Sequence, residues 1–297
     1  MRVFTPKQIE VIIAMINVPT FAIIGTKKSG KTTITENLVS SFVKEGFKVI
    51  AIKNVHEGSL AFGPNLKDSQ RLFQAGASMV IAASPNEMEI IKKIDEDEKS
   101  LENLFKLIQR KAEIVFLEGF KERVLEKKEI AKIIVIKSID EAFGFLKNSK
   151  NVIAIAGELD MNSIERLSSF QIPVFNYKKR MDSLIDLVKK HFEKLSLVFK
   201  TMNELPLLNC GHCGYEDCFE FAKAITEKTK SKDDCFILRQ EEKVQVEILG
   251  KKLSLHPFVQ DFIRKTVLGM LSSLKNVEID GDEEVSITLT KSRFKYK

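Results

Sequence analysis

The chain has 297 residues, of which 44% are hydrophobic, an ordinary composition for a globular protein of about two domains. Its net charge of +6 comes from 47 basic and 41 acidic residues interspersed along the chain, which favours a solvated surface over a nucleic-acid or acidic-lipid interface. No run approaches the roughly 18 apolar residues of a membrane-spanning helix, and no signal-peptide cleavage site is evident, so we expect a cytoplasmic protein.

A glycine-rich segment near the start of the chain is the first strong motif. After an expected helix at 5–17 and a buried strand at 21–24, the residues from Gly25 to Thr32 match G-x-x-x-x-G-K-T and lead into a helix. Such a loop points its backbone N–H groups at a phosphate, and the helix N-terminus adds partial positive charge. We therefore expect a bound nucleoside triphosphate, with Lys31 at the β- and γ-phosphates and Thr32 on Mg²⁺. The phosphate-binding residues predicted here are Gly25, Lys28, Ser29, Gly30, Lys31, Thr32 and Thr33.

Strands and helices alternate after this loop. We expect strands at 47–53, 79–83, 114–118, 133–136, 152–155 and 174–175, and helices at 67–75, 87–94, 101–109 and 182–195. The alternation predicts an α/β fold of the P-loop NTPase type, with a mostly parallel sheet covered on both faces. Functional side chains are then expected at the carboxyl ends of the strands.

Four polar residues fit that expectation. Glu118 ends a buried strand where a Walker B acid belongs, so we expect it to act on Mg²⁺ or the attacking water, with Lys31 as the other catalytic group. Lys53 and His56 follow the second strand and are candidates for phosphate binding, and Asp68 is either a second acid at the metal or a helix cap. No guanine-reading N-K-x-D motif with correct spacing is found at 136–140, so these residues do not distinguish GTP from ATP.

Four segments in order resemble the MobB family of molybdopterin-guanine dinucleotide biosynthesis proteins. They are Gly25 to Thr33, Ala51 to His56, Lys67 to Ala77 and Phe116 to Lys121, within roughly residues 20–140. The resemblance implies a GTP-binding protein with weak GTPase activity that assists attachment of a nucleotide to molybdopterin. It also implies that Gly30, Lys31 and Thr32 hold phosphates and Mg²⁺, with Asp68 and Glu118 at the metal. The sequence departs from the family pattern at three places. Lys27-Lys28 stand where the family tends to have small residues, no second His lies beside His56, and Leu66 stands where Gly is usual.

All four cysteines lie between residues 210 and 235. Cys210, Cys213 and Cys218 form C-x₂-C-x₄-C, and Cys235 follows. Four thiolates suit zinc or an iron–sulfur cluster, and we favour the cluster because zinc ribbons usually carry two C-x-x-C knuckles. The Pro-x-x-Asn-Cys-Gly-x-Cys-Gly segment also resembles a small [4Fe–4S] domain family.

The final segment predicts a small α+β unit of ββαβ order. A hairpin is expected at 244–249 and 252–255, a helix from residue 257, and a last strand at 285–289. The expected division is a P-loop domain at 1–198, a small helical four-cysteine domain at 199–240 and the α+β unit at 241–297.

These patterns favour a GTP-binding maturation factor that uses GTP, Mg²⁺ and a [4Fe–4S] cluster. The expected partners are molybdopterin-cofactor biosynthesis proteins or a molybdenum or tungsten iron–sulfur enzyme, and self-association into a homodimer is a further option. Two alternatives stay open: a redox-responsive nucleotide-binding module without turnover, and an ATP-dependent metallocluster carrier.

Overall fold

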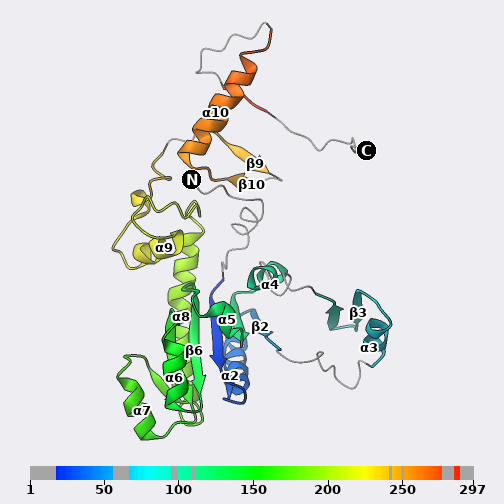
Figure 1. Cartoon of the computed structure of the whole chain (residues 1–297), viewed down its shortest axis with the longest axis vertical. Helices are drawn as coiled ribbons and strands as arrows, with labels where there is room; N and C mark the ends of the chain where they lie inside the picture. The colour runs from blue at the N-terminus through cyan, green and yellow to red at the C-terminus, as the bar shows by residue number, and fades with distance from the viewer. Residues whose placement is uncertain are drawn as a thin grey trace. The chain divides into compact units, whose positions relative to one another are not determined.

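The computed structural model describes residues 18–55, 67–94, 100–108, 112–240, 243–248, 251–275 and 284–287. The chain separates into two compact units, Met1–Thr201 and Met202–Lys297 (Figure 1). The helix expected at 5–17 and residue His56 lie outside the described residues.

A six-stranded parallel sheet forms the core of the first unit, in the order β2-β5-β1-β6-β7-β8. Its strands are β1 (Thr20–Gly25), β2 (Val49–Lys53), β5 (Ile114–Glu118), β6 (Ile130–Ile136), β7 (Val152–Gly157) and β8 (Val174–Asn176). Every residue of β5 and β6 is buried, as expected where both faces of a parallel sheet are covered. The predicted α/β fold with a mostly parallel sheet is confirmed.

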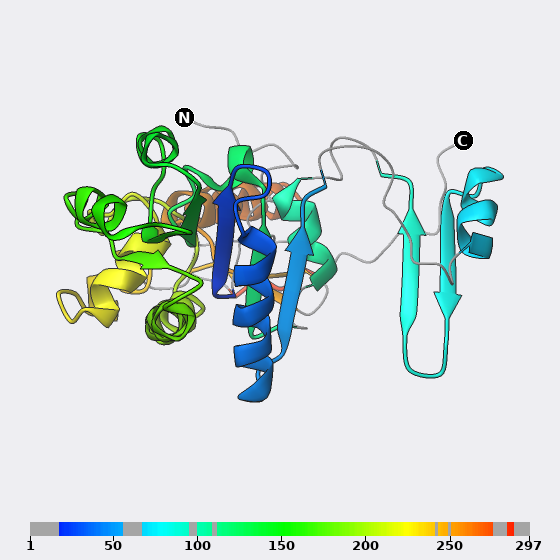
Figure 2. The same cartoon turned by 90° about the horizontal axis from the view of Figure 1, so that it is seen from below.

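Helices alternate with these strands or follow the last of them. They are α2 (Lys31–Lys44), α4 (Leu101–Ile108), α5 (Lys121–Val124), α6 (Ile139–Leu146), α7 (Met161–Ser168) and α8 (Met181–Met202). Helix α2 packs along β1, β2 and β5 (Figure 2). The Phe42 ring of α2 lies 5.6 Å from Phe116 of β5 and 5.2 Å from Phe192 of α8, centroid to centroid. This aromatic cluster fixes the helix whose first turn carries Lys31.

The segment between β2 and α4 corrects one predicted element. Strands β3 (Met79–Ala83) and β4 (Met88–Lys92) form an antiparallel pair, accompanied by α3 (Lys67–Gln74). The helix predicted at 87–94 is therefore wrong. Met88, Ile91 and Ile94 have the three-residue spacing of a helix face, but pairing with β3 selects the extended form and buries Ile91 opposite Val80.

The second unit contains short elements. They are α9 (Cys218–Thr226), the 3₁₀ helix η3 (Lys232–Asp234), β9 (Val246–Ile248), β10 (Lys251–Leu253) and α10 (Pro257–Leu271). Strands β9 and β10 form the expected antiparallel hairpin, and α10 follows it. Residues 284–287 do not form a strand, and 288–289 lie outside the described residues, so the last element of the ββαβ pattern is not found in the part described.

The compact units divide after Thr201, still within α8 and three residues beyond the boundary expected at 198/199, whose exact position stays a prediction. The further division of the second unit at residue 240 stays a prediction.

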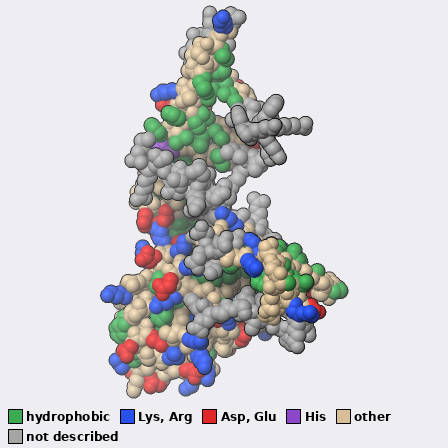
Figure 3. Space-filling model, turned by 45° about the vertical axis from the view of Figure 1, so that its right-hand side comes forward, with side chains coloured by type: hydrophobic (Ala, Val, Ile, Leu, Met, Phe, Trp, Pro, Cys, Tyr) green, Lys and Arg blue, Asp and Glu red, His purple; other side chains and the backbone are tan. Residues whose placement is uncertain are grey.

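Acidic and basic side chains intermingle over the visible face of the first unit (Figure 3). Among the described residues, no helix is both long and apolar enough to cross a bilayer.

Gly157 is held by a close backbone approach at the end of β7. It pairs with Ile136 of β6, and a β-carbon on it would lie 2.5 Å from the Ile136 carbonyl oxygen. We expect Gly157→Ala to lower the free energy of unfolding by about 1–3 kcal/mol. To make room for the methyl group, β6 and β7 would have to separate and lose backbone hydrogen bonds. Denaturant unfolding measures the change.

Gly144 provides the matched control. It lies within α6, and no atom comes within 4 Å of an added β-carbon. Gly144→Ala should therefore raise the free energy of unfolding by about 0.5–1 kcal/mol through helix propensity. Equal stability of the two alanine variants would contradict the close approach at Gly157.

Candidate functional site

An open hollow of about 850 Å³ lies where β1, β2 and β5 end. The parallel register aligns these strands, so their carboxyl ends meet at one edge of the sheet. The volume is in the range of small-molecule sites. Its lining residues are Gly25, Lys27, Lys28, Ser29, Gly30, Lys31, Thr32, Thr33, Lys53, Asn54, Val55, Glu118, Gly119, Lys121 and Tyr177.

The loop between β1 and α2 supplies most of this lining. Lys28 and Gly30 adopt left-handed backbone angles, with φ of 58° and 100°, and α2 begins at Lys31. The Lys31 Nζ donates to the carbonyl oxygen of Thr26, so the amine folds back over the loop. Burial lowers the pKa of Lys31, and the nearby Glu118 carboxylate partly opposes this shift. The loop thus brings a lysine and a helix N-terminus to one small space, as phosphate binding requires.

Tyr177 closes one side of the loop, and sequence analysis did not single it out. A β-carbon on Gly30 would lie 2.4 Å from the Tyr177 hydroxyl. That hydroxyl donates to Glu158 Oε1 at 3.1 Å, and Lys178 Nζ lies 2.9 Å from the same oxygen. The one available signal was position, because Tyr177 directly follows the carboxyl end of β8.

A second contact ties the loop to the first turn of α6, which follows β6. Thr26 Oγ1 donates to Glu141 Oε1 at 3.0 Å, and the Glu141 Oε2 accepts from the Lys137 backbone N–H at 2.9 Å. Residues that follow β6 and β8 therefore hold the loop from two positions.

Three of the predicted site residues meet beside Lys31. Thr32 Oγ1 donates to Glu118 Oε1 at 2.6 Å, and Lys53 Nζ lies 3.0 Å from the same carboxylate oxygen. Lys53 also donates to Thr32 Oγ1 at 3.3 Å. Hydroxyl and carboxylate oxygens are ligands that Mg²⁺ prefers, so the chemistry of Thr32 and Glu118 fits this ion.

Asp68 is not brought to this cluster by the structure. It is an exposed residue of α3, it is absent from the lining of the hollow among the described residues, and its carboxylate lies 3.5 Å from Arg71. The roles predicted for Asp68 and His56 at the nucleotide therefore stay predictions.

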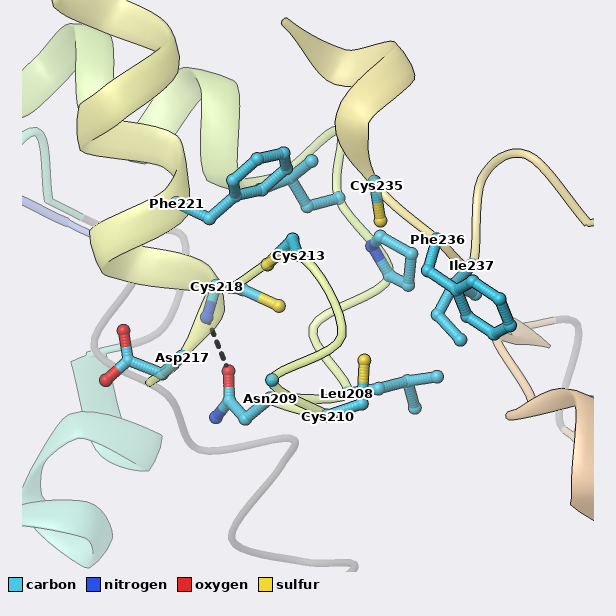
Figure 4. A pocket seen from close by; sticks show the side chains of 13 residues that line it. Leu208, Asn209, Cys210, Cys213, Asp217, Cys218, Phe221, Cys235, Phe236 and Ile237 are labelled. Carbon is cyan, nitrogen blue, oxygen red and sulfur yellow. Dashed lines mark hydrogen bonds between the residues drawn. The ribbon is translucent and has the colours of Figure 1, made fainter. Parts of the chain in front are cut away.

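The four cysteines of the second unit surround a common space (Figure 4). Their sulfur atoms face one another across it, while Leu208, Phe221 and Ile237 contribute apolar walls. Cys235 is buried and the other three are partly buried. In the described part of the chain, no three His, Cys, Asp or Glu side chains form a ready site for a single ion. Four thiols in an apolar setting are the donor set of an iron–sulfur cluster, and in that respect the residues fit one.

Local hydrogen bonds shape the segment at 207–218, which carries three of the four cysteines and is called the cysteine loop below. The Asn209 side-chain oxygen accepts from the Cys218 backbone N–H at 2.9 Å, and Asp217 caps α9 by accepting from Glu220 N–H at 2.9 Å. Leu207, Asn209, Gly211 and Gly214 all have positive φ angles, which bend the chain around the thiols. Burial raises the pKa of the Cys218 thiol.

His212 lies between two of the cysteines and points elsewhere. Its ring centroid is 4.8 Å from that of Phe236, and its Nε2 is 3.1 Å from Nε2 of His256. His256 in turn caps α10 by accepting from Phe258 N–H at 3.2 Å. The histidine pair thus connects the cysteine loop with the start of α10.

Comparison with known families agrees with this geometry. Residues 20–158 match the family described as "Molybdopterin guanine dinucleotide synthesis protein B", or MobB. This part of the chain is a MobB-family P-loop domain. Residues 205–237 match a second family, described as "Putative Fe-S cluster", which spans all four cysteines.

Individual relatives are distant. The chain is 28% identical over 270 residues to a Methanocaldococcus jannaschii protein named "Putative molybdopterin-guanine dinucleotide biosynthesis adapter protein", covering 91% of this chain and 97% of the relative. A Haemophilus influenzae "Molybdopterin-guanine dinucleotide biosynthesis adapter protein" is 28% identical, over 52% of this chain and 87% of its own length. The crystal structure of Bacillus subtilis MobB matches 58% of this chain and 96% of its own, with 22% identity and a TM-score of 0.47.

Asn209→Ala tests whether the Asn209–Cys218 bond positions the cysteine loop. The substitution leaves the Cys218 N–H without its acceptor, so we expect about 1 kcal/mol lower stability and weaker retention of iron. Thermal unfolding and iron content after gel filtration measure the two effects. Asn203→Ala is the control, because Asn203 is exposed and belongs to the same compact unit. Identical iron retention in both variants would show that the bond does not position the loop.

Proposed function

We propose that this protein binds Mg²⁺–GTP in the P-loop hollow, hydrolyses it slowly, and assists proteins that attach a nucleotide to molybdopterin. The observation that carries the proposal is the meeting of Lys31, Thr32 and Glu118 at one end of the sheet. The MobB-family match over the same residues supports the choice of GTP and of this pathway.

The residues of the hollow have separate tasks in this proposal. Backbone N–H groups of the loop and the Lys31 amine hold the phosphates, while Thr32 and Glu118 hold Mg²⁺ directly or through water. Bound Mg²⁺ would neutralise charge on the β- and γ-phosphates. Glu118, a buried residue, also orients the attacking water. Asn54 and Val55 line the hollow, so nucleotide contacts extend to the residues that directly follow β2.

In this proposal the second unit also carries a [4Fe–4S] cluster. Cys210, Cys213, Cys218 and Cys235 are the proposed ligands, and the match to an iron–sulfur family supports them. The cluster transfers electrons, senses redox state or docks a molybdenum or tungsten iron–sulfur enzyme. An ATP-dependent cluster carrier is the competing function, and nucleotide preference separates the two.

Anaerobic calorimetry with Mg²⁺–GTP and Mg²⁺–ATP side by side tests the nucleotide. We expect clear GTP preference, and loss of binding by at least about tenfold in Lys31→Ala, because the loop amine no longer offsets phosphate charge. A preference for ATP would instead favour the function of an ATP-dependent cluster carrier. Equal, weak heats for both nucleotides in wild type and Lys31→Ala would contradict nucleotide binding altogether.

Iron reconstitution tests the cluster. Anaerobic iron and sulfide should give about four irons per chain and a reducible visible chromophore, because four thiolates match one cubane cluster. Replacing all four cysteines by serine should abolish both signals while leaving GTP binding measurable. Stoichiometric zinc in place of iron, with no chromophore, would show a structural zinc site instead.

A further inference from the structure

Lys53 occupies the side of the hollow where Mg²⁺ is expected. Its Nζ lies 3.0 Å from Glu118 Oε1 and 3.3 Å from Thr32 Oγ1, and those two oxygens are 2.6 Å apart. One ammonium group therefore contacts both oxygens that the proposed function assigns to the metal.

The electrostatic setting explains why a cation belongs there. The Glu118 side chain is only 11% exposed, and a carboxylate that is nearly withdrawn from water needs a partner of opposite charge. Lys31 Nζ donates to the Thr26 carbonyl oxygen, and Lys53 is the side chain that forms the ion pair with Glu118. The Lys53 side chain is 55% exposed, and it can move away without disturbing the buried core.

We propose that Lys53 is a resident counter-ion which Mg²⁺ displaces, and that its released ammonium then pairs with the terminal phosphate of the bound nucleotide. The inference rests on the proposed function and extends it to a residue with two successive partners. Mg²⁺ would take up the oxygen lone pairs that now accept from Lys53, and its double charge repels an ammonium at that distance. Lys53 and the glycine-rich loop line the same hollow. A nucleotide bound there would therefore place its terminal phosphate within reach of the released ammonium group.

Pairing with the terminal phosphate gives Lys53 a role in nucleotide hydrolysis. Water attacks the terminal phosphorus while the bond to the bridging oxygen breaks, which yields a nucleoside diphosphate and inorganic phosphate. Negative charge on the phosphate oxygens is stabilised by fixed cations in such a site. Lys53 transfers no proton in this step and acts only through its charge. Before nucleotide binds, the positive charge of Lys53 disfavours binding of Mg²⁺ at the metal position.

The experiment measures metal binding and turnover in the full chain. Mn²⁺ serves as the probe for the Mg²⁺ position, followed by electron paramagnetic resonance without nucleotide, and GTP hydrolysis is followed under saturating Mg²⁺. The variants are Lys53→Met, which removes the charge, and Lys53→Arg, which keeps it. Lys48→Met is the matched control, because it removes the same charge beside the opposite end of β2, where Lys48 is exposed.

We expect Lys53→Met to bind Mn²⁺ at least about tenfold more tightly than wild type, because the competing cation is gone. Its kcat should fall by about 100-fold, as when one charge-stabilising group is removed from such a site. Lys53→Arg should stay near wild type in Mn²⁺ affinity, and Lys48→Met should match wild type in both measurements.

Unchanged Mn²⁺ affinity in Lys53→Met would overturn the counter-ion role. Unchanged kcat in that variant would overturn the phosphate contact. A wild-type protein that binds neither nucleotide would refute the proposed function, whereas tighter Mn²⁺ binding by Lys53→Met would still support the resident counter-ion. The two failures are therefore distinguishable.

Discussion

Thr32 Oγ1 and Glu118 Oε1 are 2.6 Å apart, although 86 positions of the chain separate them, and the phosphate site depends on that contact. The parallel register of β1 and β5 places Ile23 opposite Glu118 just before the loop begins. Packing of Phe21 on Phe116, with centroids 5.9 Å apart, helps to hold this register. A slip by one residue would turn Glu118 to the other face of the sheet, so the aromatic core determines the polar chemistry at its edge.

The cysteine loop is organised on a different principle. Among the described residues, no strand lines the space between the thiols, and four residues with positive φ angles together with two side-chain hydrogen bonds bend a short segment around it. Such conformations cost free energy, and metal binding in small modules offsets costs of this kind. On the proposed function, binding of the cluster would offset part of the conformational cost of the segment that carries the four cysteines.

Local sequence was sufficient for the parts of the fold with strong local signals. The apolar runs at 114–118 and 133–136 predict buried strands, and the glycine-rich loop between strand and helix predicts where phosphate would bind. The apolar spacing at 87–94 suits a helix, but the segment pairs with β3, which ends at Ala83, and this hairpin pairing selects the extended form. Local sequence could not identify Tyr177 and Glu141, since their contacts with Gly30 and Thr26 depend on the order of strands far apart in the chain.

The phenol of Tyr177 fills the space that any side chain at Gly30 would need. An allele with a larger residue at position 30 would thus combine two lesions: it would alter the loop that faces phosphate and detach the segment after β8. In a complementation experiment, the phenotype of such an allele could not be assigned to phosphate contact alone. Alleles of Lys31 leave Tyr177 in place, so in genetic work they report on the phosphate loop by itself.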